Sequence, residues 1–494
     1  MPKPRSAASH EPSAVPSFTV RSLTDPQIDR LHQASLDILE HAGVRFHAEC
    51  AVEALRRAGA SVSESNLVRI PPHLVEWALR AAPKNITIYD RNGRRAASLG
   101  GHRCYYSVGS DCASIYDLHT GVRRKAELQD VACGARLVDA LANIDFVMSM
   151  FLPSDAPSLT YEAYQMEIML SQCRKPVIFV GLTPASTTYA LDMAAAVAGG
   201  MQELARRPFV INYVNPVSAF QFNEEAALRL IYAAERNIPT IAVSAGGRGM
   251  SLPITRAGAL AAGNAGQLAG LVLSQVVREG SPFIRGGGAV GGINMRTLTS
   301  SYARPDGLQG WDLAHFYGLP LFGTGGCSDA KLFDAQAAAE AALSLFSNTI
   351  AGANLIHDIG YLDFAMTGSL ELVAYCDELI GWLKEYLRDL EITEEGLALD
   401  LVEKIAPDGN FLETEHTLRH LRDDVWDPGL ADRRNYDAWA AAGATTLQQR
   451  ANHKVWQILE THRPEPLPAR ALAEIRAVRD RADAEAQAAS GMGC

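Results

Sequence analysis

The chain has 494 residues, of which 48% are hydrophobic and 20% are charged, a composition typical of a large globular enzyme rather than a disordered chain. Its net charge of −11 at pH 7 argues against a general attraction to nucleic acid or to an anionic membrane. Eight scattered cysteines form no Cys-x-x-Cys pair, which argues against zinc-ribbon and thioredoxin-type chemistry and predicts free thiols in a reducing cytoplasm.

The first hundred residues predict a tail and a helical region. Residues 1–18 are rich in Pro and Ser and lack an apolar core, so we expect a flexible tail and no signal peptide. Residues 19–100 contain two stretches with apolar residues at helical spacing. The first ends on a glycine and the second begins with two prolines, as helices often do: TDPQIDRLHQASLDILEHAG and PPHLVEWALRAAP.

Residues 101–370 alternate short apolar runs with longer helical patterns. Strands that alternate with helices favour a parallel sheet, and about eight such units over roughly 250 residues are what a TIM (β/α)8 barrel requires. An open, doubly wound sheet is the alternative. The predicted strands are CYYSVG, IDFVMSMFLP, PVIFVGL, PFVINYVNP, PTIAVSAGG, PFIRGGG, LPLFGTGG and ANLIHDIG.

Two C-terminal segments complete the predicted α/β fold. We expect residues 371–463 to form a helical region packed on the barrel, and residues 464–494 to form a Pro-rich connector and a terminal helix. The polar surface of that last helix, at about 469–488, indicates a solvated arm or a contact in a homo-oligomer. The most apolar stretch, AGALAAGNAGQLAGLVLSQVV, contains Asn264 and Gln267 and many small residues, and we interpret it as a buried helix and not as a membrane span.

The carboxyl ends of the strands are where a parallel barrel has its active site. Here these ends consist of small and polar residues, several with adjacent glycines, which would leave room for a large molecule to approach the backbone. Strand-to-helix turns in general also favour Gly, Ser and Asp, so one such turn alone carries little weight. The predicted strand ends are SVGSD, PSD, GLT, NP, SAGG, GGG, TGGC and HDIG.

His357 lies at the end of the last predicted strand, and a histidine at that place favours a catalytic role. Aromatic side chains near several strand ends would suit a quaternary ammonium group, because the ring quadrupole attracts a cation that cannot donate hydrogen bonds. Aromatic residues also fill protein cores, so this hint is weak by itself. The predicted substrate-binding residues are Tyr105, Tyr106, Tyr213, Asn215 and Phe364.

Three further patterns have a functional and an ordinary interpretation. GGGAVGG fits a dinucleotide-binding fingerprint, but the residues that follow do not predict a helix. In EHTLRH, His416 and His420 have a spacing that can hold zinc, yet the Glu that follows the first His in zincins is missing. Cys327 has no identified base beside it, so we expect a small filler at a crowded turn and not a nucleophile.

Four stretches together resemble the trimethylamine methyltransferase family of corrinoid-dependent methyltransferases, and the resemblance covers most of residues 25–460. It implies a TIM barrel that transfers a methyl group from an amine to the cobalt of a corrinoid (cobalamin) held by a separate small protein, with no tightly bound metal in this chain. It also implies that a rim faces the corrinoid, formed by Gly286, Gly287, Gly325, Gly326 and Cys327. The stretches are IYDLHTGVRRKAELQDVACGARLVDALANIDFV, PITRAGALAAGNAGQLAGLVLSQVVREGSP, GTGGCSDAKLFDAQAAAEAAL and HTLRHLRDDVWDPGLADRRNYDAW.

The loop GTGGCSDAK separates two groups within that family. In the founding trimethylamine enzymes a pyrrolysine lies in this loop, whereas this chain has ordinary residues there. Relatives without pyrrolysine act on quaternary amines such as glycine betaine, proline betaine and carnitine, so the resemblance predicts a methyltransferase for a glycine betaine-like amine. Trimethylamine or another methylated donor and a non-catalytic binding homologue are the alternatives. Gly266 and Gln267 depart from the acidic residue expected in relatives.

Overall fold

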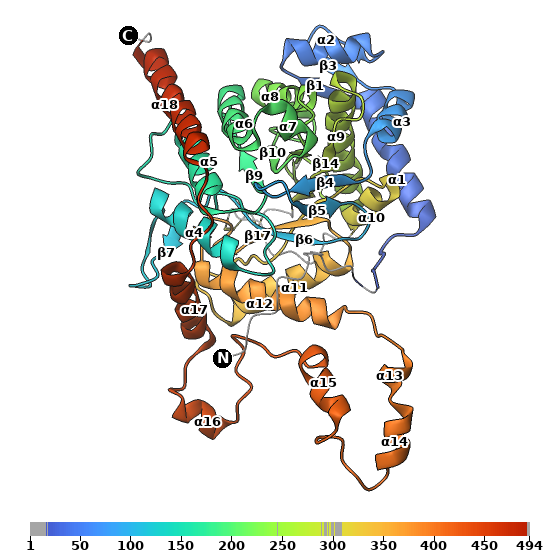
Figure 1. The fold of residues 1–494 in the computed structure, drawn as a ribbon. Coiled ribbons are helices and arrows are strands. Elements are labelled where there is room, and N and C mark those ends of the chain that lie inside the picture. The colour runs from blue at the N-terminus through green and yellow to red at the C-terminus, as the bar shows by residue number, and fades with distance from the viewer. Residues whose placement is uncertain are drawn as a thin grey trace.

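The structure is a computed structural model that describes residues 16, 18–244, 246–287, 289–290, 294, 296–297, 301 and 309–491 (Figure 1). It has the α/β fold that the sequence predicted, with parallel strands at the centre and helices around them. Apart from 16 and 18, the tail expected at residues 1–18 lies outside the described residues.

Both helices predicted in the N-terminal region are present. α1 (Asp25–Asp37) begins at a capping box on Thr24 and continues into a π-helical turn, η1 (Ile38–Ala42). α3 (Pro72–Ala81) has a proline in its first turn, where the missing N–H costs no hydrogen bond. Short strands accompany the helices, so the region is mixed and not purely helical: α2 (Glu49–Arg57), β1 (Val44–Phe46), β2 (Ser61–Val62), β3 (Leu67–Arg69), β4 (Ile86–Tyr89) and β5 (Arg95–Leu99).

The central strands pair in parallel one after another, and the last of them pairs with the first. We call this set of strands the strand ring. Each strand coincides with one of the predicted apolar runs, because a parallel strand covered on both faces is apolar throughout. In order, the pairings join β6 (Tyr105–Val108), the segment around Phe146 and Val147, β9 (Val177–Val180), β10 (Val210–Val214), β12 (Thr240–Ala242), β14 (Phe283–Arg285), β16 (Phe322–Thr324), β17 (Leu355–Ile359) and again β6.

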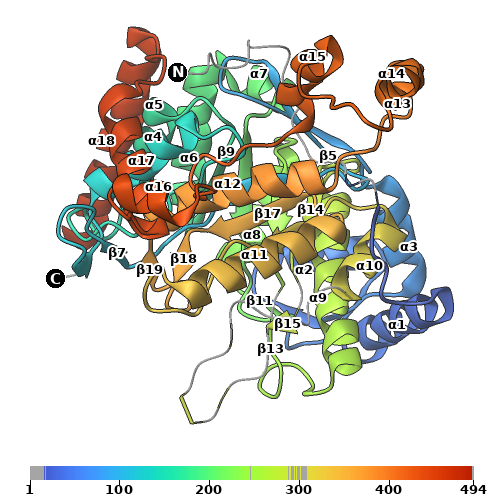
Figure 2. The same ribbon diagram turned by 90° about the horizontal axis from the view of Figure 1, so that it is seen from below.

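Helices cover the outside of the strand ring (Figures 1 and 2). Among the described residues, one helix, α9, is long and apolar enough to cross a membrane, and most of it is buried inside the protein, as we expected for this stretch. The covering helices are α4 (Leu128–Ala140), α5 (Tyr161–Gln172), α6 (Pro184–Ala198), α7 (Met201–Arg206), α8 (Glu224–Glu235), α9 (Arg256–Val277), α10 (Gln309–Tyr317), α11 (Ala335–Ile350) and α12 (Leu370–Tyr386).

Small sheets follow the carboxyl ends of the ring strands. The chain leaves β17 into β18 and β19, and these pair with β7 and β8, which come after β6. The end of β12 leads into β13, which pairs in parallel with β15 after β14. The strands are β7 (Ser114–Tyr116), β8 (Arg123–Lys125), β11 (Gln221–Phe222), β13 (Gly246–Gly247), β15 (Ala289–Val290), β18 (Tyr361–Leu362) and β19 (Thr367–Gly368).

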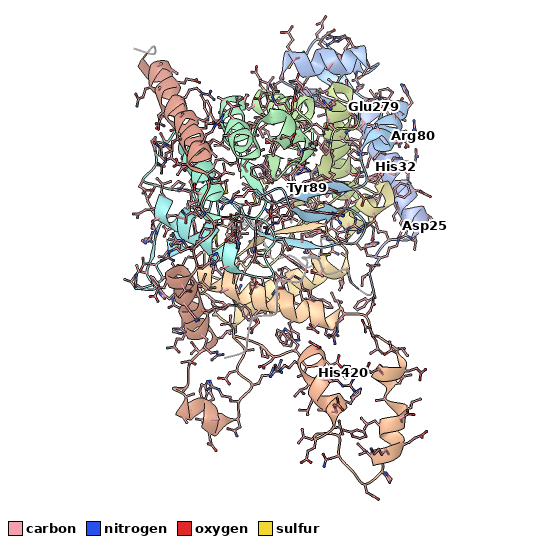
Figure 3. All side chains as sticks on the ribbon, in the orientation of Figure 1. Asp25, His32, Arg80, Tyr89, Glu279 and His420 are labelled. Carbon is pink, nitrogen blue, oxygen red and sulfur yellow. The ribbon has the colours of Figure 1, made fainter. Side chains whose placement is uncertain are left out.

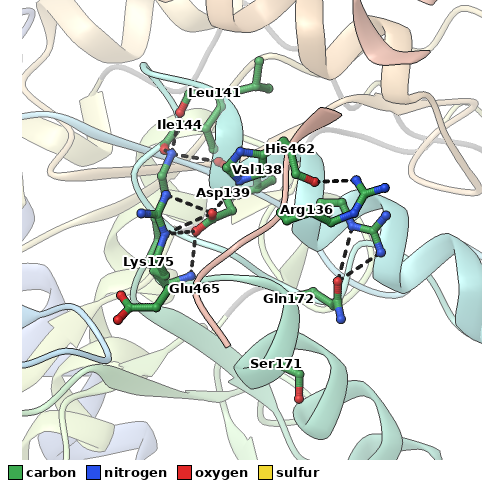
Figure 4. A network of polar contacts seen from close by, with 12 residues as sticks. Arg136, Val138, Asp139, Leu141, Ile144, Ser171, Gln172, Lys175, His462 and Glu465 are labelled. Atoms are coloured by element: carbon green, nitrogen blue, oxygen red, sulfur yellow. Dashed lines mark hydrogen bonds and ion pairs between the residues drawn. The ribbon is translucent and has the colours of Figure 1, made fainter. Parts of the chain in front are cut away.

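The C-terminal connector is held on the ring by buried polar contacts (Figure 4). Asp139, whose side chain is fully buried, accepts hydrogen bonds from Arg174 N (2.7 Å) and lies 2.7 Å from His462 Nε2. Burial alone would raise the pKa of Asp139, but the hydrogen bonds from Arg174 and His462 outweigh it and lower that pKa. Beside it, Lys175 Nζ donates to the carbonyl oxygens of Val138 and Leu141 at the end of α4.

The terminal helix, α18 (Ala469–Gly491), is not the solvated arm that was one of the two possibilities predicted from its polar sequence; the other, a contact in a homo-oligomer, stays a prediction. It lies against α5 and α6 of its own chain. Ile475 and Ala482 are buried on one face, and Asp483 accepts hydrogen bonds from Thr160 Oγ1 (2.5 Å) and Tyr164 Oη (2.6 Å). Apolar residues at only a few positions therefore suffice to dock a helix that is otherwise charged.

The segment between α12 and α17 (Leu447–Thr461) is largely exposed. We call residues Arg388–Gly429 the arm; all of them are described and none is buried. The arm meets the body at Trp426, which stacks on Trp382 of α12 with ring centroids 5.8 Å apart. It projects from the body, with His420 far from the ring (Figures 1 and 3). Its helices are α13 (Glu394–Leu397), α14 (Leu399–Ile405) and α15 (Glu415–Asp424), and α16 (Tyr436–Ala441) follows.

Candidate active site

Three rings meet inside the carboxyl end of the strand ring. Phe322 of β16 stacks on His357 of β17, with ring centroids 3.7 Å apart, and meets Tyr213 of β10 edge-on at 5.8 Å. Successive side chains of a strand point to opposite faces, which places these three on the inner face together. Of the residues predicted for the site, the structure thus brings Tyr213 and His357 to one place and adds Phe322.

His357 is held from both sides of its imidazole. Nδ1 lies 2.7 Å from Gly323 O, and because a carbonyl oxygen only accepts, Nδ1 carries a hydrogen. Nε2 lies 3.1 Å from Asp358 Oδ1, so a hydrogen bond there places one proton between the two groups. Burial lowers the pKa of His357, and the nearby charge of Asp358 opposes that shift. The ring is therefore fixed in orientation and disfavours an isolated positive charge.

Three carboxyl groups lie at the same end of the ring. Asp111 follows β6, Asp358 belongs to β17, and Glu162 in the first turn of α5 accepts a hydrogen bond from Leu182 N (3.3 Å) after β9. Burial raises the pKa of Asp111 and of Glu162. Burial also raises the pKa of Tyr213, and the charges of Asp358 and Asp111 add to that rise. The inner end of the ring is consequently both acidic and aromatic.

Gly109, at the end of β6, makes room for this arrangement. A Cβ atom at Gly109 would lie 2.2 Å from the ring of Tyr361 and 2.6 Å from Asp358 Oδ1. Asp358 itself has a φ of 76°, a left-handed conformation that is uncommon for residues other than Gly, Asn and Asp. The position of the Asp358 carboxylate therefore depends on a glycine 249 residues earlier in the chain.

The structure does not bring Tyr105 and Tyr106 to this site, contrary to their predicted role. Both are buried: Tyr105 Oη accepts a hydrogen bond from Ser98 N (2.9 Å), and Tyr106 Oη lies 2.9 Å from Thr349 Oγ1 on α11. They occupy the first half of β6, so the alternation of the strand directs one inward near the opposite end of the ring and the other outward to the helices.

The two remaining predicted contacts lie near strand ends. Asn215 is exposed just after β10, and its amide group is placed to donate to Val243 O (2.9 Å). Phe364 is half-buried between β18 and β19, with a φ of 55°. Neither touches the stacked rings through a contact that would assign it a role, and both stay predictions.

The predicted corrinoid-facing rim is mostly closed. Gly286, Gly325, Gly326 and Cys327 are all buried, and a Cβ at Gly286 would lie 2.4 Å from Ala242 O. Gly287 is different, because a Cβ there would meet only Phe322 O, at 3.8 Å. Burial and the charge of Asp358 hold the pKa of the Cys327 thiol well above its usual range, which makes it a poor nucleophile and fits the filler role we expected.

The other two patterns of the sequence have local explanations. After β14, Ala289 and Val290 of GGGAVGG form the short strand β15, which pairs with β13. Three glycines of the pattern, Gly288, Gly291 and Gly292, lie outside the described residues. The rings of His416 and His420 lie 4.5 Å apart with their planes tilted by 40°, and His420 Nε2 lies 3.4 Å from Glu395 Oε1. In the described part of the chain, no group of three or more His, Cys, Asp and Glu side chains is arranged to hold a metal.

Comparison with known proteins places the chain in a family. Residues 4–487 match the family described as trimethylamine methyltransferase (MTTB). The chain belongs to the trimethylamine methyltransferase family. It is 32% identical over 472 residues to trimethylamine methyltransferase MttB of Desulfitobacterium hafniense (strain DSM 10664 / DCB-2), with 94% of each chain covered. It is 30% identical over 459 residues to the glycine betaine methyltransferase of strain Y51, covering 92% of this chain and 95% of that one.

Sequence reasoning missed Asp111, Glu162 and Phe322 as members of the site. Asp111 belongs to a strand end that the sequence had marked, and Phe322 lies in a predicted strand just before another, but nothing in the pattern says which side chains turn inward. Glu162 lies in a helix without a motif of its own, and only its hydrogen bond to the end of β9 connects it with the site. An acidic residue in the first turn of a helix that follows a ring strand is the signal that could have found it.

Proposed function

We propose that this member of the trimethylamine methyltransferase family moves a methyl group from a quaternary amine resembling glycine betaine to cob(I)alamin carried by a small corrinoid-binding protein. The observation that carries the proposal is the inner end of the strand ring, where the aromatic rings of Tyr213 and Phe322 lie close to carboxyl groups. A quaternary ammonium is a permanent cation that cannot donate hydrogen bonds, so aromatic faces and nearby negative charge are what can hold it.

The chemistry places few demands on the protein. In the proposed transfer the C–N bond breaks, its electron pair stays on nitrogen, and the methyl group bonds to the acceptor through the acceptor's own electron pair. The product is a neutral tertiary amine, so no general acid is needed. The side chains would bind the cation, orient one methyl group toward the opening and exclude water. His357, fixed by Gly323 and Asp358, would orient the substrate.

We further propose that the strand ring is a TIM (β/α)8 barrel with additional N-terminal and C-terminal helices. An open sheet has two edge strands, whereas the pairings here return to β6, which supports the barrel. In such a barrel the corrinoid partner approaches the carboxyl ends of the strands. Gly287, beside Phe322 O and without other close neighbours for a Cβ, is the rim glycine compatible with that approach.

Trimethylamine is the second candidate donor, because a trimethylamine methyltransferase is among the similar relatives. The loop from Thr324 to Lys331 favours the quaternary amine. It has no pyrrolysine, and Lys331 Nζ is engaged by Asp329 O (2.7 Å) and Asp363 Oδ1 (3.3 Å). Protonated trimethylamine differs from a quaternary amine by an N–H that needs an acceptor, and loss of that proton would turn its leaving group into an amide anion.

The test follows the spectrum of the acceptor. The protein is incubated with cob(I)alamin and, in parallel, with glycine betaine, carnitine or trimethylamine. We expect methylcob(III)alamin and an equimolar amount of tertiary amine with a quaternary donor. Methyl transfer from trimethylamine and from no quaternary amine would show that the substrate class is wrong. No transfer from any methylated amine would support a non-catalytic binding homologue instead.

A further inference from the structure

Arg229 of α8 lies buried behind the candidate site and is only 4% exposed. Its Nη1 donates hydrogen bonds to Gly181 O, directly after β9, and to Tyr213 O (3.4 Å) in β10. Its Nε donates to Glu225 O (3.3 Å), one turn earlier in α8. One side chain thus joins the carboxyl ends of two neighbouring strands of the strand ring, and one of these strands carries Tyr213 of the candidate site.

The acceptors that Arg229 contacts do not match its charge. All three are backbone carbonyl oxygens, which carry a partial and not a full negative charge. Burial lowers the pKa of Arg229 to about 10, and the charges of Glu225, Tyr213 and Glu162 oppose that shift. The guanidinium therefore stays protonated at pH 7. A buried cation is costly unless negative charge lies near it, and the acidic end of the strand ring supplies that charge.

The peptide group between Gly181 and Leu182 connects Arg229 with Glu162. Its carbonyl oxygen accepts from Arg229 Nη1, and its N–H donates to Glu162 Oε1 (3.3 Å). The two groups of a trans peptide point in opposite directions, so the guanidinium and the carboxyl group lie on opposite sides of one peptide. The peptide dipole favours both charges, because its negative end faces the cation and its positive end faces the carboxylate.

Close packing holds this peptide in place. A Cβ atom at Gly181 would lie 2.7 Å from Thr187 Oγ1 and 3.0 Å from Thr187 N, in the first turn of α6. In the same turn, a hydrogen bond with Ser186 favours the charged form of Glu162. The peptide is therefore a fixed link between the two charges and not a loop that happens to pass between them.

The other titratable groups that interact with Glu162 are acidic. Burial is the largest cause that raises the pKa of Glu162, and the charge of Asp111 adds to it. Burial also raises the pKa of Tyr161, and the charges of Glu162 and Asp111 add to that rise. Arg229 acts in the other direction, because its charge lowers the pKa of Tyr213 against the effect of burial. Among these described groups, Arg229 supplies the positive charge.

We propose that Arg229 is a positioning residue of the methyl-transfer site, which keeps Glu162 negatively charged through the Gly181–Leu182 peptide and fixes the strand end that carries Tyr213. The inference rests on the proposed function, because a carboxylate and an aromatic ring are what would hold the quaternary ammonium. Arg229 acts from behind the strands and through these two groups. It offsets the repulsion between Glu162 and Asp111, so that both can be charged when the substrate binds.

Arg285 offers a matched control. It lies at the end of β14, is 2% exposed, and burial lowers its pKa to about 10, as for Arg229. Its guanidinium faces α10 and α9, with Nη1 donating to Gly310 O (3.1 Å) and Nη2 to Asn264 Oδ1 (3.2 Å). Arg285→Met therefore removes an equally buried cation that does not share a peptide with Glu162.

The first test is a double-mutant cycle in melting temperature, measured on the full chain without any methyl donor. Without Arg229 the charged form of Glu162 is less stable, so Glu162→Gln should raise the melting temperature more in Arg229→Met than in the wild-type background. At pH 8 we expect the excess to be about 1–2 °C, which corresponds to a pKa change of about one unit. At pH 4 it should vanish, because Glu162 is then protonated in both backgrounds.

Arg229→Gln separates charge from hydrogen bonding, since it keeps a donor for Gly181 O and lacks the charge. It should give the same excess as Arg229→Met, and it decides the cycle if the methionine variant does not fold. In the Arg285→Met background the gain from Glu162→Gln should equal that in wild type. An equal gain with and without the Arg229 charge at pH 8 would overturn the proposal, as would an excess that persists at pH 4.

The second test is the pH dependence of kcat/KM for the quaternary donor that the wild-type protein demethylates with cob(I)alamin. The acid limb should move up by about one pH unit in Arg229→Met and Arg229→Gln and stay in place in Arg285→Met. A loss of rate that is equal at every pH would assign Arg229 a merely structural role and overturn the proposal. If no methylated amine is a donor, the proposed function fails, while the melting cycle still reads the coupling of Arg229 and Glu162.

Discussion

Charged side chains usually lie on the surface of a protein and large apolar ones inside it, and the strand ring and the arm depart from this rule in opposite ways. At the carboxyl end of the ring, Glu162 and Asp358 are buried carboxyl groups and Asp111 is half-buried. On the arm, apolar side chains such as those of Leu418 and Leu412 are exposed to water. Buried charge and exposed apolar surface both raise the free energy of a folded chain by itself. The carboxyl groups of the ring are what the proposed binding of a small cation requires, whereas the arm lies outside the proposed site.

The largest effect is expected when the ring loses a negative charge. Asp111→Asn keeps the size of the side chain but removes a charge near the proposed cation. For charges about 5 Å apart in an effective dielectric of about 20, Coulomb's law gives roughly 3 kcal/mol, so kcat/KM for the quaternary amine should fall on the order of a hundredfold. Initial rates of methylcob(III)alamin formation measure this. Asp29→Asn on the exposed face of α1 is the control, and an equal loss there would refute the assignment.

A smaller effect, a weaker affinity for the substrate, is expected when the strand ring loses an aromatic side chain. Tyr213→Leu removes the π face while keeping the site apolar, and a cation–π contact of about 0.5–2 kcal/mol corresponds to a rise in KM of roughly 2- to 30-fold. Tyr213→Phe retains the face and should retain KM. Tyr106→Phe, which removes the contact with Thr349, should lower the free energy of unfolding by about 1 kcal/mol and leave KM unchanged. Equal KM values for Tyr213→Leu and wild type would remove Tyr213 from the site.

The arm should differ from the ring in its response to a protease. No residue within Arg388–Gly429 is buried, so this segment can open without loss of the core, and its cleavage should be roughly tenfold faster than any cleavage in the ring strands. Mass spectrometry of the first fragments reads out the site of cleavage. First fragments that end within the ring strands would contradict this difference.

The smallest effect concerns stability. Burial holds the pKa of Glu162 above its value in the unfolded chain, so the folded state binds this proton more tightly. The resulting stability is present below the unfolded pKa and is lost as pH rises through the folded pKa. At pH 7 Glu162→Gln should therefore raise the melting temperature, by about 1–4 °C for a protein of this size. The gain should shrink at pH 4, and a gain of equal size at both pH values would exclude this cause.

Much of the fold could be predicted because a strand that is buried on both faces is a continuous apolar run in the sequence. Every ring strand is a short apolar run, and the helix α9 was recognised from its small residues and its Asn and Gln. The arm could not be predicted in this way. Its leucines follow the same helical spacing as those of a packed helix, and the sequence does not say whether the surface opposite them belongs to the same chain.

The site was predicted only in part for a related reason. His357 and Tyr213 were chosen because each lies near the end of a predicted strand, and the structure brings both rings against Phe322. Tyr105 and Tyr106 were misplaced because they lie in the first half, where the side chains face the opposite end of the ring or the helices. The loop at Gly325, Gly326 and Cys327 was expected to be open, but the folding of β18 and β19 beside it closes it, a contact between distant segments that no local pattern contains.

The closure of the strand ring also sets an order in time. β6 pairs with β17, so Tyr105 can pair with Leu355 only after the 250 residues that separate them in the chain have been synthesised. Ribosomes add about 5–20 residues per second, so β6 spends roughly 10–50 s with one edge unpaired while the rest of the ring is being made. An unpaired edge is a template for pairing with other chains. The hazard of aggregation for this protein is therefore concentrated in the nascent chain, and it ends when β17 leaves the ribosome.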